Sequence, residues 1–199
     1  MKLYIDPGTG SMLFAVLIGI IGAVAYVFKE WAVKLKFLLT GGKKADTNTE
    51  KIPIVIFSDD KRYWSVFKPI CEEMNSRGID VVYMTASKDD PAFDENLQHL
   101  DAQFIGEGNR AFSKLNFLNA TMLISTTPGL DVFQWKRSKN VDYYVHVLHA
   151  ASNTCGYHMF GIDYYDAVLI SGNHHERDIR ALEKIRNLPA KELVMVGVP

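Results

Sequence analysis

The sequence has few of the residues that mark a disulfide-stabilised or metal-binding protein. Only two of its 199 residues are cysteines, Cys71 and Cys155, and they lie far apart. This excludes a disulfide framework and a zinc site with closely spaced cysteines, and it fits a reducing compartment. An excess of charge of one sign is also missing, because 22 basic residues face 23 acidic ones. Nucleic-acid binding driven by bulk charge is therefore not expected. Internal repeats are absent, and nothing predicts a metal or a cofactor.

One long apolar run stands near the amino terminus. Residues 11–28, SMLFAVLIGIIGAVAYVF, carry no charge, and together with residues 8–10 they reach the roughly 20 residues that a membrane helix needs. The lysines that follow outnumber the acidic residues of the same flank: Lys29, Lys34, Lys36, Lys43 and Lys44. The positive-inside rule therefore predicts a single-pass protein of the cell membrane, with the amino terminus outside and the remainder in the cytoplasm. A cleaved signal peptide is the alternative, but the cationic cluster lies on the wrong side for one.

The chain accordingly divides into three predicted parts. Residues 1–40 form a membrane anchor, with a transmembrane helix at about residues 8–28. Residues 41–50, GGKKADTNTE, form a polar linker. Residues 51–199 form the folded domain.

Short apolar runs alternate with segments of helical periodicity throughout residues 51–199. Strands are predicted at Pro53–Phe57, Asp80–Met84, Ala102–Ile105, Thr121–Ser125, Tyr143–Leu148, Ala167–Ile170 and Leu193–Val196. Helices are predicted within Tyr63–Met74 with a kink or late start at Pro69, at Phe93–Leu100 and Asn109–Leu118, and from Ser171–Asn173 to Asn187. A further helical turn is predicted at Leu130–Trp135. This alternation predicts an α/β, Rossmann-like domain with a mostly parallel sheet and helices on both faces.

The strongest candidate for chemistry is His149, which stands just past a predicted strand end. The small residues that follow it, from Ala150, leave space for a ligand. A neutral imidazole at such a position can take a proton from a substrate hydroxyl. A purely structural histidine is an equally good interpretation of the residue alone. His146, within the strand, is interpreted as structural.

Two strand ends offer groups to a phosphate. Thr126, Thr127 and Gly129 follow one strand with hydroxyls and backbone amides, but they lack the spacing of a P-loop, so an ordinary turn is the alternative. Ser171 and Gly172 open a helix whose first amides can hold an anion, and an ordinary N-cap is the alternative there.

Two further clusters have less specific interpretations. The stretch HHERD at residues 174–178 contains metal-ligand residue types, but only its first and last members share a helix face, so no metal site is predicted. The basic run KRSK at residues 136–139 is typical of a solvated surface, or of one that meets anionic lipid headgroups or phosphates.

Two long segments resemble the amino-terminal half of the CDP-glycerol glycerophosphotransferase family. They are STTPGLDVFQWKRSKNVDYYVHVLHAAS at Ser125–Ser152 and FGIDYYDAVLISG at Phe160–Gly172. The opening YIDPGTGSMLF is similar to the start of membrane-anchored members. The resemblance implies one half of a GT-B architecture, in which two Rossmann-like domains enclose the active site.

The resemblance also implies a reaction and a base. Glycerol phosphate would pass from CDP-glycerol to a lipid-linked or polyol-phosphate acceptor, in teichoic-acid-type cell-wall polymer synthesis. The family's proposed base lies in a His-Gly motif, and here that position reads His149-Ala150. The chain stops where the connection to the second, nucleotide-binding domain would begin, so that domain is expected to be missing, and another polypeptide is a candidate to supply it. The alternatives are a non-catalytic, membrane-tethered binding module and a nucleotide-sugar glycosyltransferase of GT-B type.

Overall fold

The computed structural model describes residues 51–150, 152, 154 and 157–197. The predicted membrane helix and the linker lie in residues 1–50, outside the described residues. Among the described residues, no helix combines the length and the apolar character that crossing a membrane requires. The chain divides into two units, and the second, Lys51–Pro199, contains every described residue.

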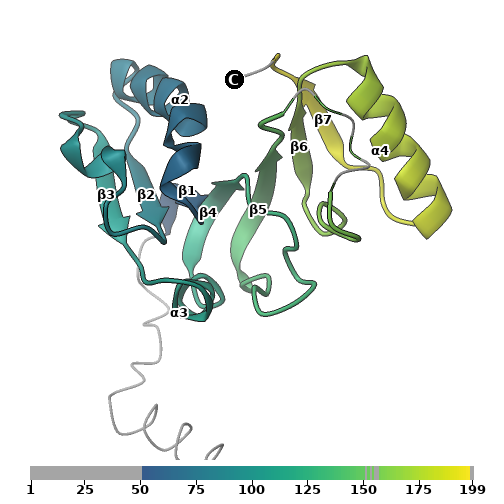
Figure 1. The fold of residues 1–199 in the computed structure, drawn as a ribbon, viewed down its shortest axis with the longest axis horizontal. Coiled ribbons are helices and arrows are strands. Elements are labelled where there is room, and N and C mark those ends of the chain that lie inside the picture. Colours follow the sequence, from purple (N-terminus) through teal and green to yellow (C-terminus); the bar gives the residue numbers. More distant parts are fainter. Residues whose placement is uncertain (1–50, 151, 153, 155–156, 198–199) are drawn as a thin grey trace, which may run out of the picture. The chain divides into compact units, whose positions relative to one another are not determined.

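A single seven-stranded sheet forms the centre of this unit (Figure 1). Every neighbouring pair of strands is parallel, which confirms the predicted parallel α/β architecture of Rossmann-like type. The strands are β1 (Ile52–Ser58), β2 (Val81–Thr85), β3 (Leu100–Phe104), β4 (Asn119–Ser125), β5 (Asn140–Val147), β6 (Ala167–Ile170) and β7 (Glu192–Met195). Continuous apolar runs suit parallel strands that are covered on both faces.

The strand order is β3-β2-β1-β4-β5-β6-β7. The chain builds outward from β1 to β3, crosses back to place β4 beside β1, and then builds outward in the opposite direction to β7. The direction therefore reverses between β1 and β4, and at such a switch point the loops leave the carboxyl ends of the two strands in opposite directions. This is the position at which open α/β sheets bind their ligands.

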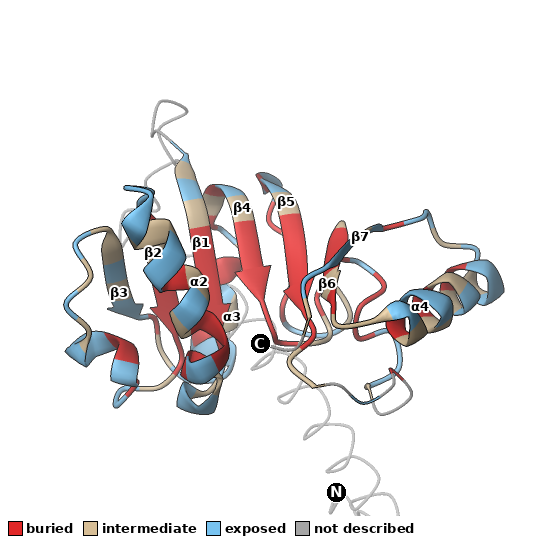
Figure 2. Ribbon diagram, turned by 90° about the horizontal axis from the view of Figure 1, so that it is seen from above, coloured by how far each residue is buried: buried red, intermediate tan, exposed pale blue. Residues whose placement is uncertain are grey.

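Helices cover both faces of the sheet. On one face, α2 (Trp64–Ser76) packs through Phe67 and Cys71 against strand residues such as Ile56. On the other face, α3 (Asn109–Leu115) packs through Leu115 against the side of the sheet that carries Phe57. The third helix, α4 (Asn173–Arg186), contacts β6 in a separate apolar cluster. Figure 2 shows the resulting gradient, with buried residues along β1, β4 and β5 and mostly exposed residues along the edge strand β7.

The ends of α2 and α4 follow from local sequence signals. Pro69 lies inside α2, and a 3₁₀ turn at Lys61–Tyr63 precedes that helix. Gly78, with φ of 67°, lies two residues past the last residue of α2 and supplies the left-handed conformation that side chains resist. Asn187 does the same for α4, with φ of 53°. Within α4, Ile179 is buried as expected, but Ile185 is 80% exposed, so the apolar face is shorter than predicted.

One predicted helix and one predicted helical turn are not formed. In place of a helix at Phe93–Leu100, a 3₁₀ turn spans Pro91–Asp94, because the Asp90 carboxylate accepts a bond from the Ala92 amide and holds a tight turn. Leu130–Trp135 is a turn rather than a helix. Asp131 adopts φ of 63° there, and the buried Trp135 ring anchors the segment in the core.

Candidate functional site

The carboxyl ends of β1, β4 and β5 bring three groups of polar residues to one edge of the sheet. These strands are neighbours, so the residues that follow them are neighbours too. Asp59 follows β1, Thr126 and Thr127 follow β4, and His149 follows β5 after Leu148. We refer to Asp59, Tyr63, Thr126, Thr127 and His149 as the switch-point cluster. It lies where the order of the strands reverses, which is the expected place for a ligand.

His149 is half-buried and held by an aromatic neighbour. Its ring lies 4.8 Å from the ring of Tyr63, which belongs to the 3₁₀ turn after β1. Its Nδ1 atom is buried and has no hydrogen-bond partner among the described residues. Burial lowers the pKa of His149, and the nearby Asp59 carboxylate opposes this only in part. The imidazole is therefore neutral near pH 7, which is the form that accepts a proton.

The sequence pattern predicted no role for Tyr63 or for Asp59, which directly follows β1. The Asp59 side chain is open to solvent, yet the surrounding protein desolvates the carboxyl enough to raise its pKa. The Thr127 hydroxyl and the His149 ring both act to lower that pKa. An acidic residue directly after a buried first strand was the available signal.

Hydrogen bonds hold the segment after β4 in place. The Thr127 amide donates to the Ser125 hydroxyl at 3.0 Å, and the Thr127 carbonyl accepts from the Tyr165 hydroxyl at 2.5 Å. The Thr126 hydroxyl is buried and has no partner within the described residues. Gly129 adopts φ of 89°, and its amide donates to the Gly161 carbonyl at 2.7 Å. The chain after β4 is thus tied to the chain before β6, and the Gly129 amide is already engaged.

A fully buried histidine, His146, lies near the end of β5, three residues before His149. His146 has no exposed surface, and a hydrogen bond of 3.2 Å joins its Nε2 to the Tyr157 hydroxyl. Its ring also lies 4.8 Å from the ring of Tyr165. Burial lowers the pKa of His146 to about 3 and raises that of Tyr157 to about 12, so both groups are uncharged at neutral pH. His146 therefore has the structural environment that the sequence predicted.

Ser171 and Gly172 lie one strand farther along, at the carboxyl end of β6. The Ser171 hydroxyl and amide lie 3.1 Å and 3.4 Å from Nδ1 of His175, a buried residue of α4. Nε2 of the same ring lies 2.7 Å from the Ser152 carbonyl oxygen. Gly172 is the N-cap of α4 and makes no side-chain cap. The phosphate-binding role of Thr126, Thr127, Gly129, Ser171 and Gly172 stays a prediction.

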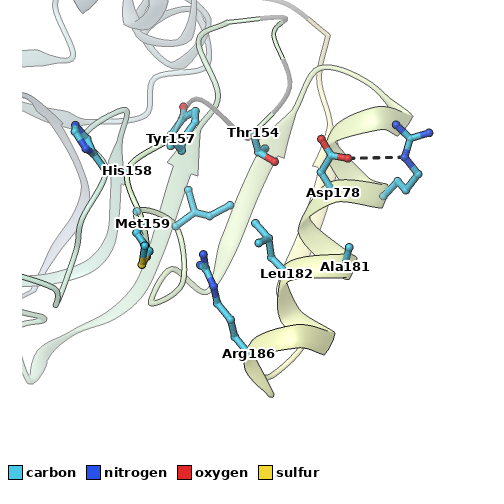
Figure 3. Close-up of a pocket in the computed structure, with 11 residues that line it drawn as sticks. Thr154, Tyr157, His158, Met159, Asp178, Ala181, Leu182 and Arg186 are labelled. Atoms are coloured by element: carbon cyan, nitrogen blue, oxygen red, sulfur yellow. Dashed lines mark ion pairs between the residues drawn. The ribbon is translucent and has the colours of Figure 1, made fainter.

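A pocket of about 630 Å³ opens between α4 and the loop from β5 to β6 (Figure 3). Tyr157 lines this pocket, and its hydroxyl is hydrogen-bonded to His146. The pocket therefore lies next to the partner of His146. Arg186 extends from α4 between Met159 and Leu182. Its guanidinium forms an ion pair of 2.6 Å with the buried Asp163. The volume falls within the range of small-molecule sites.

The metal-like stretch at residues 174–178 belongs to α4. The rings of His174 and His175 lie 4.0 Å apart, and both nitrogens of His175 have the partners described above. Across the described part of the chain, no group of three or more histidine, cysteine, aspartate or glutamate side chains is placed to hold a metal ion.

No protein-family model, curated protein or solved structure matches this chain. The central feature of the described residues is a neutral histidine beside a carboxylate and two threonines at the switch point of a parallel sheet.

Proposed function

We propose that this chain supplies the acceptor side of a glycerophosphotransferase site. In this proposal, glycerol phosphate passes from CDP-glycerol to a polyol-phosphate or lipid-linked acceptor in teichoic-acid-type polymer synthesis. The observation that carries the proposal is the half-buried, neutral His149 at the switch point. The resemblance of Ser125–Ser152 and Phe160–Gly172 to the CDP-glycerol glycerophosphotransferase family supports the choice of substrate.

His149 acts as the general base. Because Nδ1 is buried, Nε2 is the nitrogen that a substrate reaches. Nε2 takes the proton of the acceptor hydroxyl, and the acceptor oxygen forms a bond to the phosphorus that carries the glycerol. The bond from that phosphorus to the CMP oxygen breaks, and CMP leaves with the electron pair. The Asp59 carboxylate stabilises the imidazolium that forms, because its charge favours the protonated ring.

Thr126 and Thr127 are the proposed contacts of the acceptor. The hydroxyls of both threonines are buried and have no hydrogen-bond partner within the described residues. A buried hydroxyl without a partner is unfavourable, and a bound ligand oxygen relieves that cost. In the proposed setting, a second GT-B domain holds CDP-glycerol, and the anchor keeps the site at the cytoplasmic face of the cell membrane.

Acceptor binding can be tested on the full chain. With the six histidines ¹³C-labelled, a short glycerol-phosphate oligomer should shift the His149 ring signals. Thr126→Val should weaken that response roughly tenfold, because a hydrogen bond to a charged group is lost. Ser113→Ala, at an exposed hydroxyl on α3, is the matched control and should leave the response unchanged. An oligomer that leaves the His149 signals unmoved would contradict acceptor binding at this site.

Catalysis is tested by CMP release from CDP-glycerol in the presence of the acceptor, with the chain joined to a GT-B domain that binds the nucleotide. His149→Asn should lower the rate at least ~100-fold, the usual contribution of a positioned base. His158→Asn, at an exposed histidine of the same loop, should keep the wild-type rate. Equal rates in the two variants would remove His149 from the mechanism. Acceptor binding without any CMP release, even with the second domain supplied, would favour the tethered binding module instead.

A further inference from the structure

The edge of the sheet opposite the switch-point cluster carries exposed phenylalanines among lysines. Phe117, just before β4, is 73% exposed, and Phe133, in the segment before β5, is 68% exposed. A group of exposed apolar side chains, rather than a single one, can mark an interaction surface. Lys114, Lys136 and Lys139 are exposed in the same two segments.

Hydrogen bonds hold these two segments side by side. The Asn116 side chain donates to the Gln134 carbonyl at 3.0 Å and accepts from the Lys136 amide at 2.7 Å. The Ser138 hydroxyl donates to the Leu118 carbonyl at 2.7 Å. We call the surface formed by Lys114, Phe117, Phe133, Lys136 and Lys139 the amino-edge patch.

In the basic run KRSK at residues 136–139, the two lysines are the exposed residues. Arg137 is directed inward, where it pairs with Asp166 at 2.8 Å and lies over the Tyr144 ring. Ser138 is buried. Lys136 lies 4.0 Å from the Asp131 carboxylate. Within the described residues, no acidic side chain pairs with Lys114 or Lys139, so the patch carries positive charge next to its aromatic rings.

The patch also lies where the chain enters the domain. Asn119 of β4 pairs with Asn140 of β5, and Ala120 pairs with Ile52 of β1, so all three strands begin at this edge. Lys51 forms an ion pair with Asp142 at the same edge. The patch therefore lies at the end of the sheet where β1 begins, away from the switch-point cluster.

We infer that the amino-edge patch binds the interface of an anionic lipid bilayer. Phenylalanines enter the boundary between headgroups and acyl chains, and lysines meet anionic headgroups through long apolar stems. A bilayer fits both features at once, and the patch would then turn the opposite edge, with its ligand site, toward the aqueous side. This inference stands independently of the proposed transferase activity.

The test measures hydrogen exchange of the full chain with lipid nanodiscs. Discs of phosphatidylcholine alone are compared with discs in which about a third of the lipid is phosphatidylglycerol. Exchange in residues 113–118 and 131–139 should slow at least roughly threefold with anionic discs only. The combined variant Phe133→Ala, Lys136→Gln, Lys139→Gln should lose this protection. Phe93→Ala with Lys88→Gln, which removes an exposed aromatic ring and a lysine elsewhere, should keep it.

Three results would overturn the inference. Exchange that is unaffected by anionic discs would remove the lipid partner. Protection that persists in the combined variant would place the contact elsewhere. Protection that appears without lipid and increases with protein concentration would assign the patch to a second copy of the chain.

Discussion

At the residue scale, the neighbourhood of His149 predicts how it titrates. Burial lowers its pKa below the ordinary value of about 6.5, while Asp59 raises it in part. Asp59→Asn should therefore lower the His149 titration midpoint further, because the protonated ring loses a favourable charge. Histidine NMR signals followed against pH measure this directly. Asp60→Asn is the control, since that carboxylate acts on Arg62. A midpoint that stays or rises in Asp59→Asn would contradict the arrangement.

His146 predicts a dependence of stability on pH. Its folded-state pKa is about 3, whereas an unfolded imidazole binds a proton below about pH 6.5. The contribution of neutral His146 to the free energy of unfolding should therefore be fully present above about pH 6.5. It should decrease at lower pH, by up to about 1.4 kcal/mol per pH unit. His146→Phe should reduce that slope in urea unfolding between about pH 7 and pH 5. His158→Phe, at an exposed position, should keep it. An unchanged slope in His146→Phe would mean that folded His146 takes up a proton.

The sequence predicted a functional residue only where the position of that residue along the chain was itself the signal. His149 was found because a histidine directly after an apolar run is visible in one dimension. Asp59 and Tyr63 were missed because their relation to His149 depends on β1 and β5 flanking β4. The shifted pKa of His149 likewise comes from burial, which a linear pattern does not specify.

At the element scale, Gly161 joins the loops on either side of β5. A Cβ at this position would lie 2.9 Å from the His158 carbonyl oxygen and 3.1 Å from Pro128. Gly161→Ala should therefore cost about 1–3 kcal/mol of stability and also weaken the His149 response to the acceptor, because the loop must shift. Chemical unfolding and histidine NMR measure the two effects.

Gly78→Ala is the matched control for that prediction. Gly78 has φ of 67°, but the nearest atom that an added Cβ would meet is 3.9 Å away. The substitution should cost about 1 kcal/mol through backbone strain alone and leave the acceptor response intact. If Gly161→Ala also spares the acceptor response, the contact between the loops does not position the site.

The sequence predicted strands better than helices. Each of the seven strands was found within a few residues of its bounds, since buried apolar runs are strong local signals. The predicted helix at Phe93–Leu100 and the predicted helical turn at Leu130–Trp135 are not formed, for side-chain and tertiary reasons. The Asp90 side chain caps a tighter turn, and Trp135 fixes its segment by burial among the aromatic rings of Phe57 and Phe112.

At the scale of the whole molecule, strand order determines where chemistry can occur. The alternation of strands and helices predicted a parallel sheet, but it left the placement of β4 beside β1 undetermined. That placement creates the switch point and puts Asp59, Thr127 and His149 at one edge. It also leaves the opposite edge, where β1, β4 and β5 begin, for the amino-edge patch.

The division of the chain predicts that Lys51–Pro199 folds without residues 1–50. All three apolar clusters of the described residues draw their members from Ile52 onward, so this unit has a core of its own. The shortened chain should unfold cooperatively, with a midpoint within about 2 °C of the corresponding transition in the full chain. It should also keep the His149 response to the acceptor. Calorimetry and histidine NMR on both chains decide this. A broad transition, or loss of the response, would show that the first 50 residues complete the domain rather than only precede it.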